Sequence, residues 1–190
     1  MRRGVKWRKS HSEKKIYLTF DDGPIPEVTP WVLDVLDKYG IPATFFCVGE
    51  NVVKHPEVFA DVLRRGHRVG NHSYNHLNGW HCSRKAYLEN IEKADRLIHS
   101  ELYRPPHGWM KSCQYRALKK KYTVVLWDVI TRDYNPRLSP ERVLWNACHY
   151  VRNGSIVVFH DSLKTVNTLK TVLPAWIEFC LSAGYEFCRL

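Results

Sequence analysis

Short apolar runs alternate along this chain with longer amphipathic segments, and this alternation limits the folds that the chain can adopt. Six short runs have the composition of strands, namely residues 15–20, 43–48, 68–71, 123–127, 155–159 and 185–188. Six longer segments show helical periodicity, namely residues 29–39, 51–65, 83–99, 112–121, 140–151 and 165–183. Strands and helices that alternate in this way form parallel sheets covered by helices, so the sequence predicts an α/β fold.

The length of 190 residues matches a single domain. Residues 14–190 carry the alternating pattern without an internal repeat or a linker, so we expect one domain over this range. Residues 1–13 are rich in lysine and arginine and show no periodicity. We therefore expect a basic N-terminal arm, residues 1–13, that is loosely attached to the domain.

The chain is strongly basic, with a formal net charge of +10 at pH 7. Such charge attracts nucleic acid, anionic membrane surfaces and acidic glycans without selecting among them. No nucleic-acid-binding motif accompanies the charge, so we expect no specific nucleic-acid partner, and a nucleic-acid-associated protein remains an alternative. No apolar stretch reaches the ~20 residues that a bilayer requires, so no membrane span is expected.

The cellular location and the oligomeric state are weakly constrained by the sequence. The six cysteines form no CxxC pair, which favours a reducing compartment. The N-terminus lacks the apolar segment and the cleavage site of a signal peptide. The cytoplasm is therefore the default expectation, with the cell envelope as the alternative if a leader has been trimmed, and no oligomeric state is predicted.

Two neighbouring carboxylates, Asp21 and Asp22, come directly after the first predicted strand, in the sequence TFDDGP at residues 19–24. Active-site loops of α/β folds gather at the carboxyl ends of strands. Successive strand residues point to opposite sides, so one carboxylate can bind a metal while the other faces a substrate. The alternative is that DDGP is only a turn.

A pair of histidines, His72 and His76, follows the third predicted strand. On a helical turn this spacing places both imidazoles on one face, and we expect such a turn here. Two histidines and one carboxylate make three protein ligands and leave a coordination position open, as catalytic zinc sites do. The sequence favours a metal-dependent hydrolase, with a chance HxxxH as the alternative.

Five ordered segments resemble the polysaccharide deacetylases of the NodB-homology type, carbohydrate esterase family 4. They are TFDDGP (19–24), HSYNH (72–76), RPPHG (104–108), WDVITRDY (127–134) and VFHD (158–161), and the resemblance covers residues 14–190. It implies a distorted (β/α) barrel of parallel strands with outer helices and fewer strands than the eight-stranded form. It also implies a hydrolase that removes acetyl groups from N-acetylated sugars, such as those of peptidoglycan or chitin.

The resemblance further implies a metal centre and a general base. Asp22, His72 and His76 would bind a divalent cation, with zinc as the first expectation and cobalt, nickel or manganese as alternatives. Asp21 would remain free as the general base, and Arg104 would hold and orient it. A metal can polarise the acetyl carbonyl and lower the pKa of a bound water, which suits the hydrolysis of an amide.

A general acid and a substrate groove are also implied by the resemblance. His160 would protonate the departing amine, and Asp133 beside it would favour the charged imidazolium. A backbone N–H of the RPPHG loop would stabilise the oxyanion. The residues implied to bind the substrate are Pro105, Pro106, His107, Gly108, Trp127, Tyr134 and Val158.

Four positions depart from the family pattern, and all of them concern the groove. Ile130 stands where the family often has aspartate, Tyr134 replaces a tryptophan, His107 replaces a tyrosine and Val158 replaces a leucine. The catalytic groups are all present, so a shift in specificity is expected. The alternative is a glycan-binding pseudoenzyme of the same fold that has lost turnover.

Overall fold

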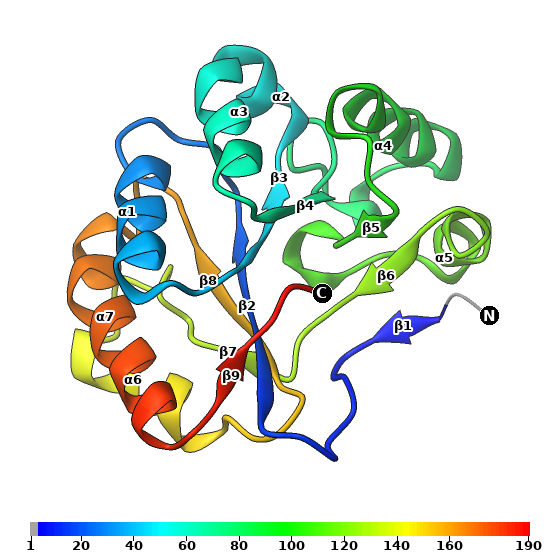
Figure 1. Ribbon diagram of the computed structural model, residues 1–190. Coiled ribbons are helices and arrows are strands. Elements are labelled where there is room, and N and C mark those ends of the chain that lie inside the picture. The colour runs from blue at the N-terminus through cyan, green and yellow to red at the C-terminus, as the bar shows by residue number, and fades with distance from the viewer. Residues whose placement is uncertain (1–3) are drawn as a thin grey trace.

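The computed structural model describes residues 4–190, so Arg2 and Arg3 of the expected arm lie outside the described residues. Strands occupy the centre and helices lie outside them (Figure 1). The strands are β1 (Val5–Lys6), β2 (Lys15–Asp21), β3 (Thr44–Cys47), β4 (Arg68–Asn71), β5 (Leu102–Tyr103), β6 (Thr123–Val125), β7 (Val129–Ile130), β8 (Ile156–His160) and β9 (Glu186–Phe187). The helices are α1 (Thr29–Tyr39), α2 (Gly49–Lys54), α3 (Pro56–Arg64), α4 (Arg84–Ile98), α5 (Ser112–Leu118), α6 (Pro140–His149) and α7 (Val166–Ser182), with 3-10 turns η1 (Gly79–His81) and η2 (Pro106–Gly108).

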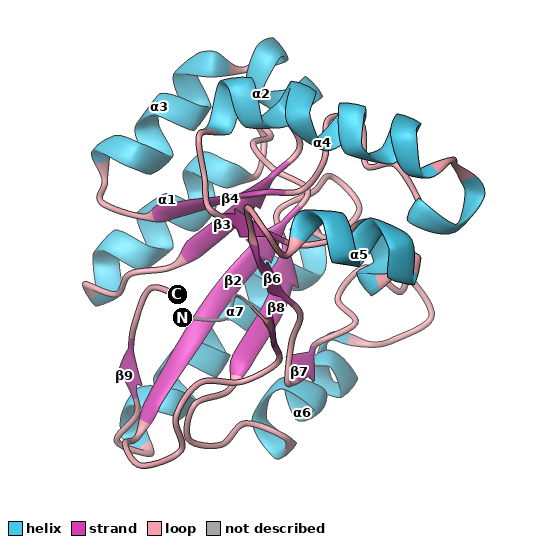
Figure 2. Cartoon of the chain, turned by 90° about the vertical axis from the view of Figure 1, so that its right-hand side faces the viewer, coloured by secondary structure: helices cyan, strands magenta, loops and turns pink. Residues whose placement is uncertain are grey.

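The strands form one curved parallel sheet that stays open. Its order is β1-β6-β5-β4-β3-β2-β8-β7, and β9 pairs with β2. Every pairing between these strands is parallel. Helices such as α3, α4 and α5 lie outside the strands (Figure 2). The predicted α/β fold, a distorted (β/α) barrel of parallel strands with outer helices, is confirmed.

The central strand β2 places different residues on its two sides. Ile16, Leu18 and Phe20 are fully buried in the main apolar cluster, which also contains side chains of α1 and α7. Each such burial stabilises the fold by about 1.5–3 kcal/mol. Because side chains alternate along a strand, Thr19 and Asp21 lie on the other side, which faces the barrel interior. The strand thereby directs Asp21 into the barrel and leaves Asp22 at the turn.

The N-terminal segment is attached to the sheet, which corrects the expectation of a loose arm for the residues from 4 onward. β1 pairs with β6, and the Leu126 N–H donates to the Lys6 carbonyl at 2.8 Å. Further along, the Lys9 N–H donates to the Gly154 carbonyl at 2.9 Å, just before β8. The segment therefore links β6 to the start of β8 with backbone hydrogen bonds.

The helix expected over residues 51–65 is interrupted. It is divided into α2 and α3 at His55, whose φ of −134° and ψ of 57° are not helical. Pro56 explains the break, because proline has no N–H for the preceding helix and disfavours a helical residue before it.

No helix within residues 4–190 has the length and apolar character needed to cross a bilayer.

Candidate active site

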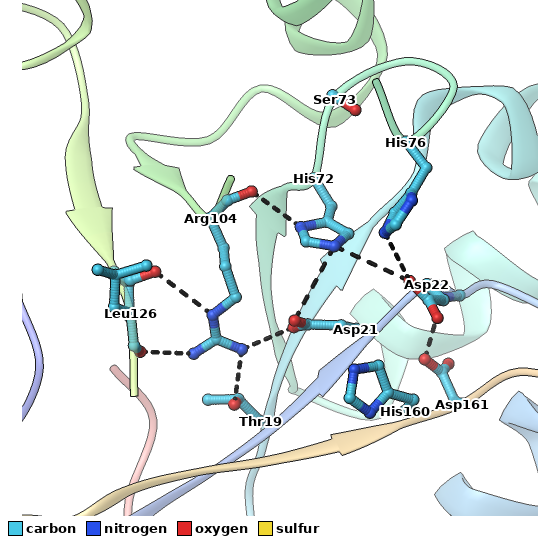
Figure 3. Close-up of polar contacts among 12 residues, drawn as sticks. Thr19, Asp21, Asp22, His72, Ser73, His76, Arg104, Leu126, His160 and Asp161 are labelled. Carbon is cyan, nitrogen blue, oxygen red and sulfur yellow. Dashed lines mark hydrogen bonds and ion pairs between the residues drawn. The ribbon is translucent and has the colours of Figure 1, made fainter. Parts of the chain in front are cut away.

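Asp21 is held at the end of β2 by a buried arginine. Arg104 is fully buried, and its Nη1 donates to Asp21 Oδ1 at 2.6 Å and to Thr19 Oγ1 at 2.8 Å (Figure 3). Its Nη2 donates to the Leu126 carbonyl at 3.1 Å. Burial opposes ionisation of Asp21, but the charge of Arg104 and the nearby histidines hold its pKa below the ordinary value. Asp21 is thus ionised, and its Oδ2 lies 3.9 Å from His72 Nε2.

Asp22 turns away from Asp21 because the chain bends sharply after β2. Its φ is +86°, a value that aspartate tolerates better than most residues. Asn51 Nδ2 donates to the Asp22 carbonyl at 2.7 Å. The Gly23 N–H donates to Asp161 Oδ1 at 3.0 Å, and a Cβ at Gly23 would lie 2.1 Å from Asp161 Oδ2. Only glycine fits there.

Asp161 is a site residue that the sequence reasoning missed. It is 1% exposed, and besides Gly23 it accepts a hydrogen bond of 2.6 Å from Thr29 Oγ1 at the start of α1. Its own N–H donates to the Asp21 carbonyl at 3.1 Å. Burial raises the pKa of Asp161 to about 8. Its signal was its place in the VFHD segment, where only the histidine was assigned a role.

His72 and His76 lie on a loop after β4, and the expected helical turn is wrong. Ser73 and His76 have φ values of +67° and +56°, which no regular helix contains. The Gly49 N–H of α2 donates to the Ser73 carbonyl at 2.9 Å and fixes the loop. The two rings nevertheless converge, with centroids 5.1 Å apart. Residues in the left-handed conformation therefore bring the two imidazoles together, as the expected helical turn would have done.

Asp22, His72 and His76 form the one group of three or more histidine, cysteine or acidic side chains in residues 4–190 whose ligand atoms lie within 4.8 Å of one another. Asp22 Oδ1 lies 3.3 Å from His76 Nε2 and 3.8 Å from His72 Nε2. This oxygen is buried and has no hydrogen-bond partner. A buried carboxylate oxygen between two imidazole nitrogens fits a divalent cation.

The protonation state of His72 also fits a metal ligand. Its Nδ1 donates to the Arg104 carbonyl at 2.8 Å, which leaves the lone pair on Nε2, the nitrogen that faces Asp22. Burial lowers the pKa of His72 to about 4, so the imidazole is neutral near pH 7. A second hydrogen bond that fixes the tautomer is typical of metal-binding histidines.

His160, at the end of β8, lies on the other side of the two carboxylates from His72 (Figure 3). Its Nδ1 donates to Asp133 Oδ1 and its backbone N–H donates to Asp133 Oδ2, both at 2.8 Å. Burial opposes the charged imidazolium, but Asp133 outweighs it and the pKa of His160 rises to about 9. The Tyr134 ring packs edge-on against the imidazole at 5.0 Å.

A cavity of about 310 Å³ brings most of the expected residues together. Its lining residues are Asp21, Asp22, His72, His76, His107, Trp127, Ile130, Tyr134, His160, Ser162 and Lys164. Gly108 packs against the Trp127 ring, where a Cβ would lie 2.5 Å from the indole. Pro105, Pro106 and Val158 are buried and do not line the cavity, so contact between them and a substrate stays a prediction.

A family model described as polysaccharide deacetylase matches residues 8–125. A peptidoglycan-N-acetylglucosamine deacetylase of Bacillus cereus is 34% identical over 196 residues, which cover 96% of this chain and 89% of that protein. Both findings agree with the resemblance seen in the sequence segments.

Solved structures give the same result for the fold. A peptidoglycan N-acetylglucosamine deacetylase, Bc1960, superposes with a TM-score of 0.88 at 27% identity, covering 98% of this chain and 90% of that one. A mutant of the CE4-family pseudoenzyme BA3943 with restored enzymatic activity superposes with a TM-score of 0.86 at 25% identity, covering 100% of this chain and 71% of that one. The chain therefore belongs to the polysaccharide deacetylase family of hydrolases.

Proposed function

We propose that the protein is a metal-dependent N-deacetylase that releases acetate from N-acetylated sugars of a glycan such as peptidoglycan or chitin. The observation that carries the proposal is the set of three metal-ligand side chains, Asp22, His72 and His76, beside an ionised Asp21 and a protonated His160 on one cavity. The deacetylase relatives support the same reaction class.

The metal centre supplies the electrophilic part of this chemistry. Asp22, His72 and His76 would bind the cation, and two imidazoles with one carboxylate are ligands that suit zinc. Bound there, a divalent cation supplies Lewis acidity for the acetyl carbonyl. Its identity as zinc, in preference to cobalt, nickel or manganese, is part of the proposal.

Asp21 is the proposed general base. Arg104 occupies its Oδ1, so Oδ2 is the oxygen left to accept the proton of the attacking water. A base must be ionised to act, and the low pKa of Asp21 keeps it so near neutral pH. Arg104 acts as a positioning residue because its other donors fix it to Thr19 and Leu126.

His160 is the proposed general acid. Asp133 holds its Nδ1, so the Nε2–H is the proton available to the departing amine. The raised pKa keeps both ring nitrogens protonated at neutral pH. Protonation of the amine is needed because an unprotonated amide nitrogen is a poor leaving group, and a positioned acid is worth about 10²–10⁴ in rate.

The loop of η2 offers one backbone donor for the oxyanion. Pro105 and Pro106 have no N–H, and those of Gly108 and Trp109 donate to carbonyls within the loop at 2.9 and 3.3 Å. The His107 N–H is the remaining donor of this loop, and His107 lines the cavity. A donor aimed at a developing oxyanion contributes about 3 kcal/mol to the rate.

A glycan-binding pseudoenzyme is the second candidate. Ile130 and Tyr134, the departures from the family pattern, both line the cavity, and a pseudoenzyme is among the structural neighbours. Against it stands the complete set of base, acid and metal ligands.

Acetate release from a panel of glycans, with the bound metal quantified on the same samples, tests the proposal. We expect release from N-acetylchitooligosaccharides or peptidoglycan that stops with a chelator and in Asp21→Asn. Glycan binding without acetate at any pH or with any added metal would favour the pseudoenzyme instead.

A further inference from the structure

The cavity that contains His160 is also lined by a lysine, Lys164, which makes no ion pair within residues 4–190. Lys164 lines the cavity on the segment after β8. Arg132 and Arg137 lie on the loop between β7 and α6, which also carries the cavity residue Tyr134. All three are exposed, and within residues 4–190 none of the three side chains makes an ion pair. We call these three residues the basic rim, although Lys164 alone among them lines the cavity.

The acids of the same two loops cannot neutralise the basic rim. Residues 131–139 and 161–165 contain two acids, Asp133 and Asp161. Asp133 is 3% exposed and accepts a hydrogen bond from His160. Asp161 is 1% exposed and accepts hydrogen bonds from Gly23 and Thr29. The two acids that line the cavity, Asp21 and Asp22, contact Arg104 and the two histidines respectively, so the charge of Lys164 is open to a ligand.

We propose that Lys164 determines specificity by binding a carboxylate of the glycan, so that the protein prefers an acidic glycan to a neutral one. The inference rests on the proposed deacetylase function and adds a substrate class to it. Lysine is a compact charge on a flexible stem, which suits a carboxylate on a sugar next to the one in the cavity. Lactyl ethers of the sugars and attached peptides are two sources of such a carboxylate.

Four matched substrates distinguish the charge and its source. They are tetra-N-acetylchitotetraose, which is neutral; a peptide-free tetrasaccharide whose alternate sugars carry lactyl carboxylates; the same tetrasaccharide with its carboxylates amidated; and the same tetrasaccharide with attached peptides. kcat and KM for acetate release are measured on each with wild type, Lys164→Gln, Lys164→Glu, Lys164→Arg and the control Lys170→Gln. Lys170 is an exposed lysine of α7 that does not line the cavity, so its substitution changes the net charge equally.

We expect wild type to prefer the carboxylated tetrasaccharide over its amidated form. Lys164→Gln should raise KM on the carboxylated substrate by about fivefold, the scale of an exposed ion pair, and should raise KM less on the neutral substrates. Lys164→Glu should raise KM further, Lys164→Arg should restore it, and Lys170→Gln should change nothing. Higher salt should weaken the preference. If the peptide-bearing substrate alone responds to Lys164, the carboxylate belongs to the peptide.

Equal losses on carboxylated and neutral substrates in Lys164→Gln, or no change on either, would overturn the inference. Failure of the deacetylase function has a different signature, namely no acetate from any substrate with wild type. Calorimetric binding of the carboxylated and amidated tetrasaccharides then decides about Lys164 without turnover. Tighter binding of the carboxylated form that is lost in Lys164→Gln supports the inference, and equal binding of both forms contradicts it.

Discussion

The proposed metal side of the site, which is Asp22, His72 and His76, and the proposed acid side, which is His160 with Asp133 and Tyr134, are built differently. On the metal side, His72 is 2% exposed and hydrogen-bonded to the Arg104 carbonyl, and its loop is tied to α2. On the acid side, Tyr134 is 44% exposed, and its loop also carries Arg132, which makes no ion pair within the described residues 4–190. We infer that the metal side serves the reaction and that the acid side, where Ile130 and Tyr134 depart from the family pattern, adapts the protein to its glycan.

Removal of the metal should have the largest effect, because it removes the function of the whole metal side. A chelator should lower acetate release by about 10⁴-fold, which corresponds to several kcal/mol of transition-state stabilisation. Zinc should restore the activity of wild type, whereas His72→Ala should not recover at equal zinc. Acetate release that persists after dialysis with a chelator, in samples shown to be metal-free, would show that the reaction does not need the metal side.

Loss of the acid should have the next largest effect. His160→Gln removes the proton that the departing amine needs, and we expect kcat to fall by about 10²–10³-fold. The bound metal should stay at the wild-type level, because His160 is not among the three grouped ligands. Single-turnover acetate release measures the loss of rate, and elemental analysis measures the bound metal. A variant that loses its metal would place His160 on the metal side.

Asp161 joins the two sides, and its substitution should have an intermediate effect. Asp161→Asn weakens the hydrogen bonds to Gly23 and Thr29 that set the turn of Asp22. We expect metal affinity to fall by about 10- to 100-fold, as when a residue that orients a ligand is changed. A competition titration with a chromogenic chelator measures it. Wild-type affinity in a folded Asp161→Asn would remove Asp161 from the positioning of Asp22.

The pH profile should show the smallest effect and sharpens the description of the acid side. In the proposed mechanism activity requires protonated His160, so activity should fall as the pH rises through about 9, and a nearby cation would lower the pH of this fall. Asp133→Asn removes the charge that raises this pKa, so the limb should move toward the ordinary value of 6.5. Activity at pH 8 should drop while activity near pH 6 is kept. If the alkaline limb of kcat/KM does not move in Asp133→Asn, then ionisation of His160 does not cause that limb.

The same shift links pH to folding. The pKa of His160 lies above its unfolded value, so its contribution to stability is complete below pH 6.5 and is lost as the pH rises through about 9. Chemical denaturation of wild type and Asp133→Asn at pH 6 and pH 9.5 measures this contribution. The two proteins should differ more at pH 6 than at pH 9.5.

The long elements of the fold were predictable from the sequence, and most of the two-residue strands were not. The helix at residues 29–39 and the strand at 68–71 agree with α1 and β4. Strands β1, β5 and β7 contain two residues each, too few for any periodicity, and they depend on pairing partners that only the fold brings near. β9 is equally short, but it lies within the strand expected at 185–188. The expectation of one continuous helix over 51–65 was wrong because Pro56 interrupts it and begins α3.

The candidate site was predictable where a motif carries its side chain to a strand end. Asp21, Asp22, His72, His76 and His160 all line the one cavity, as their segments suggested. The loop conformation that joins His72 to His76 was not predictable, because it depends on left-handed steps and on bonds from a distant helix. Asp161 was missed because its partners lie 138 and 132 residues away in the chain.

Metal stoichiometry in two neighbouring variants tests the central claim, that Asp22 binds the cation with His72 and His76 while Asp21 stays free. Wild type and Asp21→Asn should each bind one zinc ion per chain by calorimetry and elemental analysis, although Asp21→Asn should release no acetate. Asp22→Ala should bind none in the same concentration range. Zinc bound equally well by Asp22→Ala, or lost in Asp21→Asn, would contradict the account.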